Sequence, residues 1–113
     1  MREGVGLGRS PKAASKQGPL CQAIAARTCV SANEGIRLLV IAPHALFKDA
    51  GGWRLAGAIV EENGATLEPP EWTELNVADL SYIMPTERSF EPHPDYDQRD
   101  PRFDDEKVCR LTA

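Results

Sequence analysis

Long apolar runs are missing from this sequence of 113 residues. A membrane-spanning helix needs about 18 consecutive apolar residues, whereas the longest apolar stretch here, residues 38–43, is only long enough for a strand. The N-terminal segment also lacks the apolar centre of a secretory signal peptide. These absences argue against a membrane protein, and they predict a cytoplasmic location.

Cysteine is scarce, with only Cys21, Cys29 and Cys109. Their spacing contains no C-x-x-C pair, which argues against a zinc ribbon and against a thioredoxin-type redox site. An odd number of widely spaced cysteines is typical of reduced thiols in a reducing cytoplasm, where they behave as small apolar residues. We therefore predict free thiols, two of them in or near the core. A nucleophilic cysteine would need a base that the sequence does not identify.

Motifs for catalysis and for cofactors are absent as well. The glycines of residues 4–8 precede no strand–helix unit, so neither a phosphate-binding loop nor a dinucleotide site is predicted, and no cofactor is expected. Ser31 and Ser81 have no nucleophile-elbow motif around them. Residues 93–97 place His93 two residues before an aspartate and could chelate a metal. Flanking prolines stiffen that segment, so a solvated acidic segment is the preferred interpretation and no metal site is predicted.

The composition that remains is that of an ordinary globular domain, with 42% hydrophobic and 27% charged residues. The 17 Asp and Glu residues outnumber the 13 Lys and Arg residues, which gives a net charge of −4. A general nucleic-acid binder usually has the opposite balance, so any contact with nucleic acid would have to be local. The length allows one domain.

Both ends of the chain differ from its middle. Residues 1–18 are rich in glycine and in basic residues, which predicts a disordered basic tail. Residues 19–27 predict a short helix with Pro19 at its first position. Residues 85–113 combine prolines with acidic residues and isolated apolar side chains, which predicts an irregular segment that ends in an acidic tail over residues 104–113.

Between these ends the pattern predicts strands. Period-two alternation and short apolar runs, separated by turn-forming residues, indicate five strands over residues 28–32, 36–42, 53–60, 72–77 and 80–84. Gly57 predicts a bulge or a tight bend inside the third strand. Five short strands with turns between them favour a mainly β fold, a small and strongly curved antiparallel sheet or barrel.

Three motifs occur in the order in which a known family has them. Residues 35–46 contain G-x-R and then Pro-His-Ala-Leu, residues 52–55 read Gly-Trp-Arg-Leu, and residues 90–96 read F-x-P-x-P-x-Y before a further Asp-Pro. Over residues 19–103 the chain resembles the WYL domain, a family of bacterial regulators and defence proteins. The resemblance implies a small Sm-like or SH3-like five-stranded antiparallel barrel. It also implies transcription regulation through nucleic acid or small anionic effectors.

One stretch departs from the family pattern. The later strand of WYL domains carries arginines in a stretch of the type R-x-F-x-L-x-R-I, whereas residues 72–80 keep the apolar positions and lack the arginines, with Asp79 near the second of them. Losing these arginines removes charge complementarity to phosphate. The fold could therefore be kept while the usual ligand is not.

Five residues are the predicted ligand-binding residues. Arg37 and Arg54 would supply positive charge, Trp53 and Trp72 would supply stacking surface, and His44 would supply a polar contact. Each has a structural alternative: solvated or carboxylate-paired arginines, tryptophans packed in the core, and a hydrogen-bonded structural histidine.

The leading prediction is a non-catalytic, WYL-like module that senses a ligand and serves regulation. Its ligand would be a nucleotide or a single-stranded nucleic acid. A first alternative is a protein-interaction module that has lost anion binding, with a second protein or a second copy of the chain as its partner. A small hydrolase that uses His44 and His93 is the least favoured alternative, because it needs both histidines in one cleft.

Overall fold

The computed structural model describes residues 12–105 and 108–112, and one α-helix precedes the strands. In chain order the elements are α1 (Lys12–Ala26), β1 (Thr28–Glu34), β2 (Arg37–Asp49), β3 (Gly52–Glu62), β4 (Ala65–Asn76), the 3-10 helix η2 (Val77–Asp79), β5 (Leu80–Ser89), the 3-10 helix η3 (Pro101–Phe103) and β6 (Cys109–Arg110). The prediction of a mainly β fold is confirmed. The strands are longer than predicted because turns such as Asn63–Gly64 are tight and pairing continues up to them.

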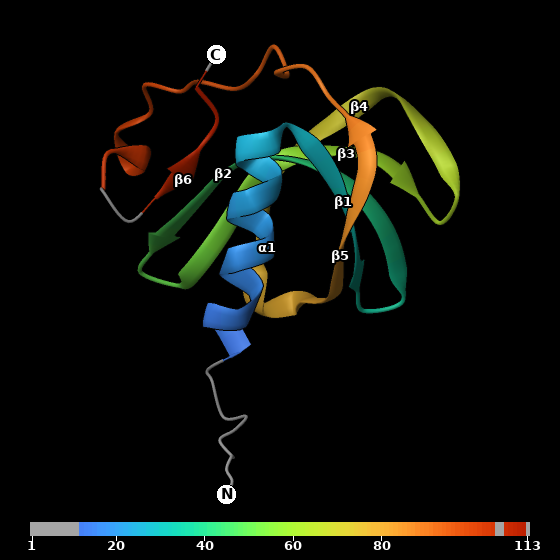
Figure 1. Cartoon of the computed structure of the whole chain (residues 1–113), viewed down its shortest axis with the longest axis horizontal. Helices are drawn as coiled ribbons and strands as arrows, with labels where there is room; N and C mark the ends of the chain where they lie inside the picture. Colours follow the sequence, from blue (N-terminus) through green and yellow to red (C-terminus); the bar gives the residue numbers. More distant parts are fainter. Residues whose placement is uncertain (1–11, 106–107, 113) are drawn as a thin grey trace, which may run out of the picture.

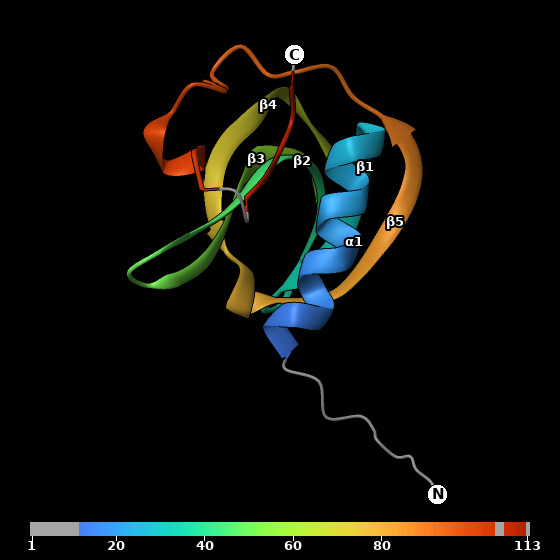
Figure 2. The same cartoon turned by 60° about the vertical axis from the view of Figure 1, so that its left-hand side comes forward.

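All strands belong to one antiparallel sheet in the order β4-β3-β2-β1-β5. The short strand β6 is added to β2. The sheet curves strongly, and α1 lies across its concave side (Figures 1 and 2). β4 and β5 remain the two edges of the strand path, so the sheet is not closed into a barrel.

A bulge in β2 produces part of this curvature. Pro43 pairs with Gly57 and Ala45 pairs with Ala56, so His44 is an extra residue without a partner on β3. A Cβ atom at Gly57 would lie 2.5 Å from the carbonyl oxygen of Ala42, which explains why glycine occupies this position. The bend that the sequence predicts at Gly57 thus has a physical basis, and it turns His44 into the interior.

The core lies between α1 and the concave face of the sheet. Leu20, Ala23 and Ile24 of α1 are buried against apolar side chains from every long strand, among them Leu39, Ile41, Leu55, Ile59, Leu75 and Leu80. A smaller cluster around Phe47 and Phe103 anchors η3 to the outer part of β2. None of the helices in the described ranges is long and apolar enough to cross a membrane.

The helix starts earlier than predicted. α1 begins at Lys12, so residues 12–18 do not belong to a tail, and Pro19 lies inside the helix rather than at its first turn. The reason is that apolar contacts of the following turns outweigh the local break at Gly18 and Pro19. Residues 1–11, the rest of the predicted tail, lie outside the described residues.

The C-terminal segment joins the fold instead of forming a separate acidic tail. β1 pairs with β2 only as far as Ile41, which leaves the later part of β2 free to pair with Cys109 and Arg110. The backbone N–H of Leu111 donates to the carbonyl of His44 at 2.7 Å. The free stretch of β2 is therefore covered by residues that lie far from it in the sequence.

The prediction of three free thiols is wrong for two of them. Cys21 of α1 and Cys109 of β6 form a disulfide across a sequence separation of 88, whereas Cys29 is free and buried. The pairing depends on the docking of β6 beside α1, which no sequence spacing reveals. Disulfides form in oxidising compartments. The cysteines therefore no longer support the prediction of a reducing cytoplasm.

Candidate functional site

The five predicted site residues do not come together. Arg37 lies at one end of the β2–β3 ladder, beside Glu62, and Trp53 lies at the other end, opposite Lys48. His44 and Trp72 are neighbours in a third place, with ring centroids 5.0 Å apart. The residues predicted as one ligand-binding site therefore lie in three separate environments.

Arg37 is held by carboxylates. Its guanidinium donates to both oxygens of Glu62, at 3.0 and 3.1 Å, and to Glu34 at 2.6 Å. The hydrogen bond from Arg37 lowers the pKa of Glu62, and the same bond raises the pKa of Arg37. This arrangement matches the carboxylate-paired alternative for Arg37. The two carboxylates already neutralise the positive charge with which Arg37 would bind an anionic ligand.

Other arginines of the surface are paired in the same way. Arg54, the second predicted cation, lies 3.2 Å from Asp49, and Arg88 lies 2.7 Å from Glu61. Arg102 binds both oxygens of Glu74, which fastens η3 to β4. These guanidinium groups could contact a phosphate only by giving up a carboxylate.

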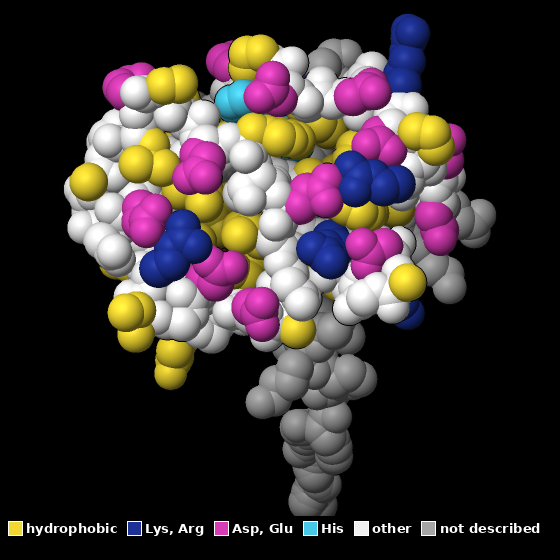
Figure 3. Space-filling model, turned by 180° about the vertical axis from the view of Figure 1, so that it is seen from behind, with side chains coloured by type: hydrophobic (Ala, Val, Ile, Leu, Met, Phe, Trp, Pro, Cys, Tyr) yellow, Lys and Arg dark blue, Asp and Glu magenta, His cyan; other side chains and the backbone are white. Residues whose placement is uncertain are grey.

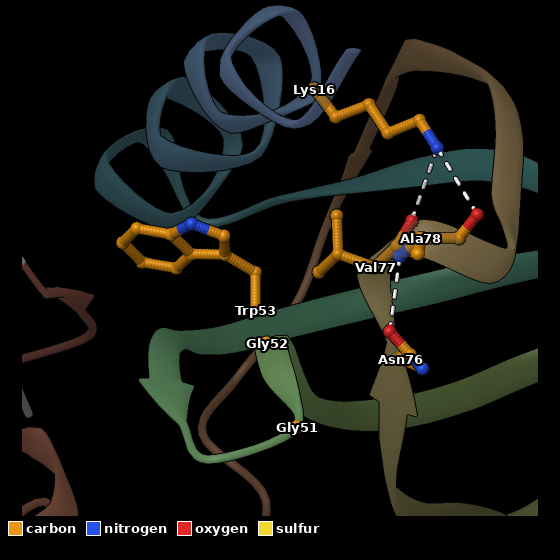
Figure 4. A pocket seen from close by; sticks show the side chains of 7 residues that line it. All are labelled: Lys16, Gly51, Gly52, Trp53, Asn76, Val77 and Ala78. Atoms are coloured by element: carbon orange, nitrogen blue, oxygen red, sulfur yellow. Dashed lines mark hydrogen bonds between the residues drawn. The ribbon is translucent and has the colours of Figure 1, made fainter. Parts of the chain in front are cut away.

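Trp53 lines an open cavity of about 500 Å³. The cavity lies between α1, the β2–β3 turn and η2, and Figure 4 shows the indole on one side of Val77 and the ammonium group of Lys16 on the other. Its lining consists of Lys16, Gly51, Gly52, Trp53, Asn76, Val77 and Ala78. We call it the Trp53 cavity. It combines an aromatic surface, an ammonium group and exposed backbone atoms in one place.

Lys16 is the cation of this cavity, and it is not among the residues that the sequence predicts for a site. Its Nζ donates to the carbonyl oxygens of Val77 and Ala78 at 3.3 and 3.4 Å, as Figure 4 shows. The Nζ of Lys48 lies 6.0 Å from the centroid of the Trp53 ring, a cation–π distance. Lys16 falls in the segment predicted as a tail, so no local signal placed it beside a tryptophan.

His44 is completely buried, with 0% of its surface exposed. Its Nδ1 lies 2.8 Å from the carbonyl oxygen of Ala42 and donates to it, while its Nε2 accepts the backbone N–H of His93 at 2.9 Å. Burial lowers the pKa of His44, the hydrogen bond to Ala42 acts in the opposite direction, and His93 lowers it further. Both ring nitrogens form hydrogen bonds to backbone groups, which matches the alternative of a structural histidine. Neither nitrogen is free to bind a ligand.

Trp72 belongs to an aromatic cluster over His44. It stacks on His93 with ring centroids 5.3 Å apart and planes at 29°, and it meets the ring of His44 edge-on. Tyr96 completes the cluster, and its hydroxyl donates to the carbonyl of Leu111 at 2.6 Å. Trp72 is half-buried, so part of the indole remains at the surface.

The two histidines that the hydrolase alternative needs, His44 and His93, do lie together. Cys29 lines a small cavity of about 200 Å³ with both of them. However, His93 Nδ1 accepts the N–H of Asp95, and its Nε2 donates to the carbonyl of Pro70 at 3.3 Å. All four ring nitrogens are thus engaged with backbone groups, and burial raises the pKa of the Cys29 thiol. Neither histidine is therefore free to act as a general base for this thiol.

Metal ligation was the other chemical possibility at residues 93–97. Within residues 12–105 and 108–112, no group of three or more His, Cys, Asp or Glu side chains is placed to hold a metal ion. His93 is used in hydrogen bonds to the backbone of Pro70 and Asp95.

Comparison with known proteins finds no relative of the chain. No protein-family model matches the chain, and no curated protein or solved structure matches it significantly. Its function therefore has to be argued from the geometry.

Proposed function

We propose that the chain is a non-catalytic binding module of the WYL-like kind, whose sheet is an Sm-like or SH3-like barrel left open between β4 and β5, and which takes a nucleotide-like ligand at the Trp53 cavity. The observation that carries the proposal is that the half-buried Trp53 and Lys16 line one cavity of about 500 Å³, with the Nζ of Lys48 6.0 Å from the centroid of the Trp53 ring. The role proposed for such a module is regulation in response to the bound ligand.

The strand order supports the barrel part of the proposal. β5 returns to pair with β1 instead of pairing with β4, its predecessor in the chain, so the sheet has to curl around its core. Closure would then require only that the edges β4 and β5 meet. The short link η2 between these strands, with Val77 buried, is consistent with that curvature.

The chemistry of the cavity supports a planar, anionic ligand. An indole face stacks with any nucleobase, which is worth about 1–3 kcal/mol per base. Lys16 uses two weak carbonyl contacts of 3.3 and 3.4 Å, so a phosphate oxygen would offer its ammonium a stronger, charge-assisted partner. The two arginines that the sequence predicts as anion contacts, Arg37 and Arg54, are both paired with carboxylates, whereas Lys16, among the described residues, is not.

The engagement of both histidines supports the non-catalytic part. His44 and His93 use all of their ring nitrogens in hydrogen bonds to backbone groups, so neither imidazole is free to act as a general base for the buried Cys29 thiol.

A single-tryptophan variant tests the proposal. The chain has two tryptophans, so Trp72→Phe leaves Trp53 as the only one. We expect saturable quenching of its fluorescence by adenosine monophosphate, and weaker quenching by adenosine because the phosphate is missing. In the same background Lys16→Met should weaken binding about tenfold, the cost of one charge-assisted hydrogen bond.

Arg37→Met is the matched control, since it removes one positive charge at the other end of the β2–β3 ladder. It should leave the affinity unchanged. The proposal fails if adenosine monophosphate causes no saturable change, or if Lys16→Met binds as tightly as the parent variant.

A further inference from the structure

A second concave surface lies around the other tryptophan. It is a groove of about 510 Å³ whose lining consists of Pro69, Pro70, Trp72, Glu91, Pro92, His93, Pro94 and Asp95. We call it the Trp72 groove. It shares no residue with the Trp53 cavity, so it can act independently of the function proposed above.

Its first wall is a bulge of β4. Glu61 of β3 pairs with Thr66, whereas Ile59 pairs with Glu71, so residues 67–70 of β4 have no pairing partner in the register to β3. This stretch, which lies between the strands predicted over residues 53–60 and 72–77, therefore departs from the regular ladder. It carries two of the four prolines of the lining.

The second wall is the segment of residues 91–95, and His93 fixes it in place. The backbone N–H of His93 donates to the Nε2 of buried His44 at 2.9 Å, and the His93 ring bonds the carbonyl of Pro70 on the first wall. Because prolines and hydrogen bonds already order both walls, a ligand would lose little conformational entropy of the protein on binding. The groove is preformed.

The charge of the groove is negative. Glu91 and Asp95 line it, and no Lys or Arg does. In the described part of the chain neither carboxylate forms an ion pair with a Lys or Arg side chain. Asp95 Oδ2 lies 4.0 Å from His93 Nδ1, which already accepts the backbone N–H of Asp95. Arg88, which lines the small cavity next to the groove, is engaged by Glu61 at 2.7 Å. Figure 3 shows such a surface, with apolar side chains sunk between acidic ones next to a histidine.

We propose that the Trp72 groove binds an extended, arginine-containing segment of a partner protein. Carboxylates attract a guanidinium and repel phosphate, which excludes nucleic acid from this surface. A planar guanidinium can contact a carboxylate and lie against the indole of Trp72 together, which a lysine ammonium does less well. The prolines would hold the apolar side chains that flank the arginine.

The test uses the full chain with Trp53→Phe, so that Trp72 is the only tryptophan. The probe is the capped pentapeptide Gly-Leu-Arg-Leu-Gly. We expect a saturable change in Trp72 fluorescence, and a dissociation constant about tenfold higher when Glu91→Gln and Asp95→Asn are combined. The same peptide with Glu in place of Arg, and a hexamer of deoxythymidine, should cause no saturable change.

The matched control combines Asp79→Asn with Glu87→Gln, which removes two exposed carboxylates outside the groove lining. It should leave the affinity for the peptide unchanged. Equal weakening by the control pair, equal binding of the Glu peptide, binding of the oligonucleotide, or no saturable change with the Arg peptide would each overturn the proposal. None of these results bears on nucleotide binding at the Trp53 cavity.

Discussion

Trp53 and Trp72 are both half-buried and both line a concave surface, yet opposite charges surround them. Lys16 and Lys48 accompany the first, whereas Glu91 and Asp95 accompany the second. In each case the decisive charge comes mainly from an element far away in the sequence, α1 for the Trp53 cavity and residues 91–95 for the Trp72 groove. The two tryptophans alone therefore do not distinguish the two surfaces, and the charged side chains that lie near them in space do.

The two surfaces are also supported differently. The Trp53 cavity depends on α1, which the disulfide of Cys21 and Cys109 joins covalently to β6. The Trp72 groove depends on hydrogen bonds around His44 and His93. Breaking each support should damage one surface more than the other.

The largest effect is expected from loss of the disulfide. Changing Cys21→Ser and Cys109→Ser together should lower the free energy of unfolding by about 4 kcal/mol, since the bond closes a loop of most of the chain. Urea denaturation followed by circular dichroism measures this. Affinity for adenosine monophosphate should fall more than affinity for the arginine peptide, because α1 carries Lys16.

Reductant provides the control for this variant. It should destabilise the parent protein to the level of the double variant and leave the double variant unchanged, because Cys29 is not in a disulfide. Equal stability of the parent protein with and without reductant would show that the bond does not support the fold.

The second effect concerns His44. Changing His44→Leu replaces the imidazole by a buried apolar side chain of similar size and leaves the N–H of His93 and the carbonyl of Ala42 without this partner. We expect a loss of about 2 kcal/mol in the free energy of unfolding. The arginine peptide should bind more weakly and adenosine monophosphate with unchanged affinity. A reversed order would refute the assignment of His44 to the groove.

A smaller effect is the pH dependence of stability. Since burial lowers the pKa of His44 below its usual 6.5, the unfolded chain takes up a proton at a pH where the folded protein does not. The contribution of His44 is complete above about pH 6.5 and is lost as the pH falls from there toward the lowered pKa. Urea denaturation between about pH 7 and about pH 5 should show this slope, and His44→Leu should reduce it.

Much of the sheet could be predicted from the sequence because its signals are local. Alternation and tight turns located five strands, and Gly57 marked the bend. The start of α1, the pairing of β6 and the disulfide were not predictable, because each depends on contacts across the chain. For the surfaces, both tryptophans were found, but Lys16 was assigned to a tail and His93 to a solvated acidic segment. Their importance comes from where the fold brings them.

The smallest effect is expected for Arg37, which lies outside both surfaces. Changing Arg37→Ala removes ion pairs with Glu34 and Glu62 whose side chains are between 23% and 38% exposed. Such pairs contribute little, so the melting temperature should fall by less than about 4 °C. Thermal denaturation at low and high salt measures this, and added salt should reduce the difference from the parent protein.

The affinity of the Arg37→Ala variant for adenosine monophosphate tests whether the ligand of the Trp53 cavity is selected by charge at that cavity alone. The sequence predicts an anion contact for Arg37, but Glu34 and Glu62 already neutralise its charge, so adenosine monophosphate should bind with unchanged affinity. A clear loss of affinity would mean that the anionic ligand reaches along the whole β2–β3 ladder. In that case charge at the Trp53 cavity alone would not select the ligand, and the contrast with the Trp72 groove would no longer explain specificity.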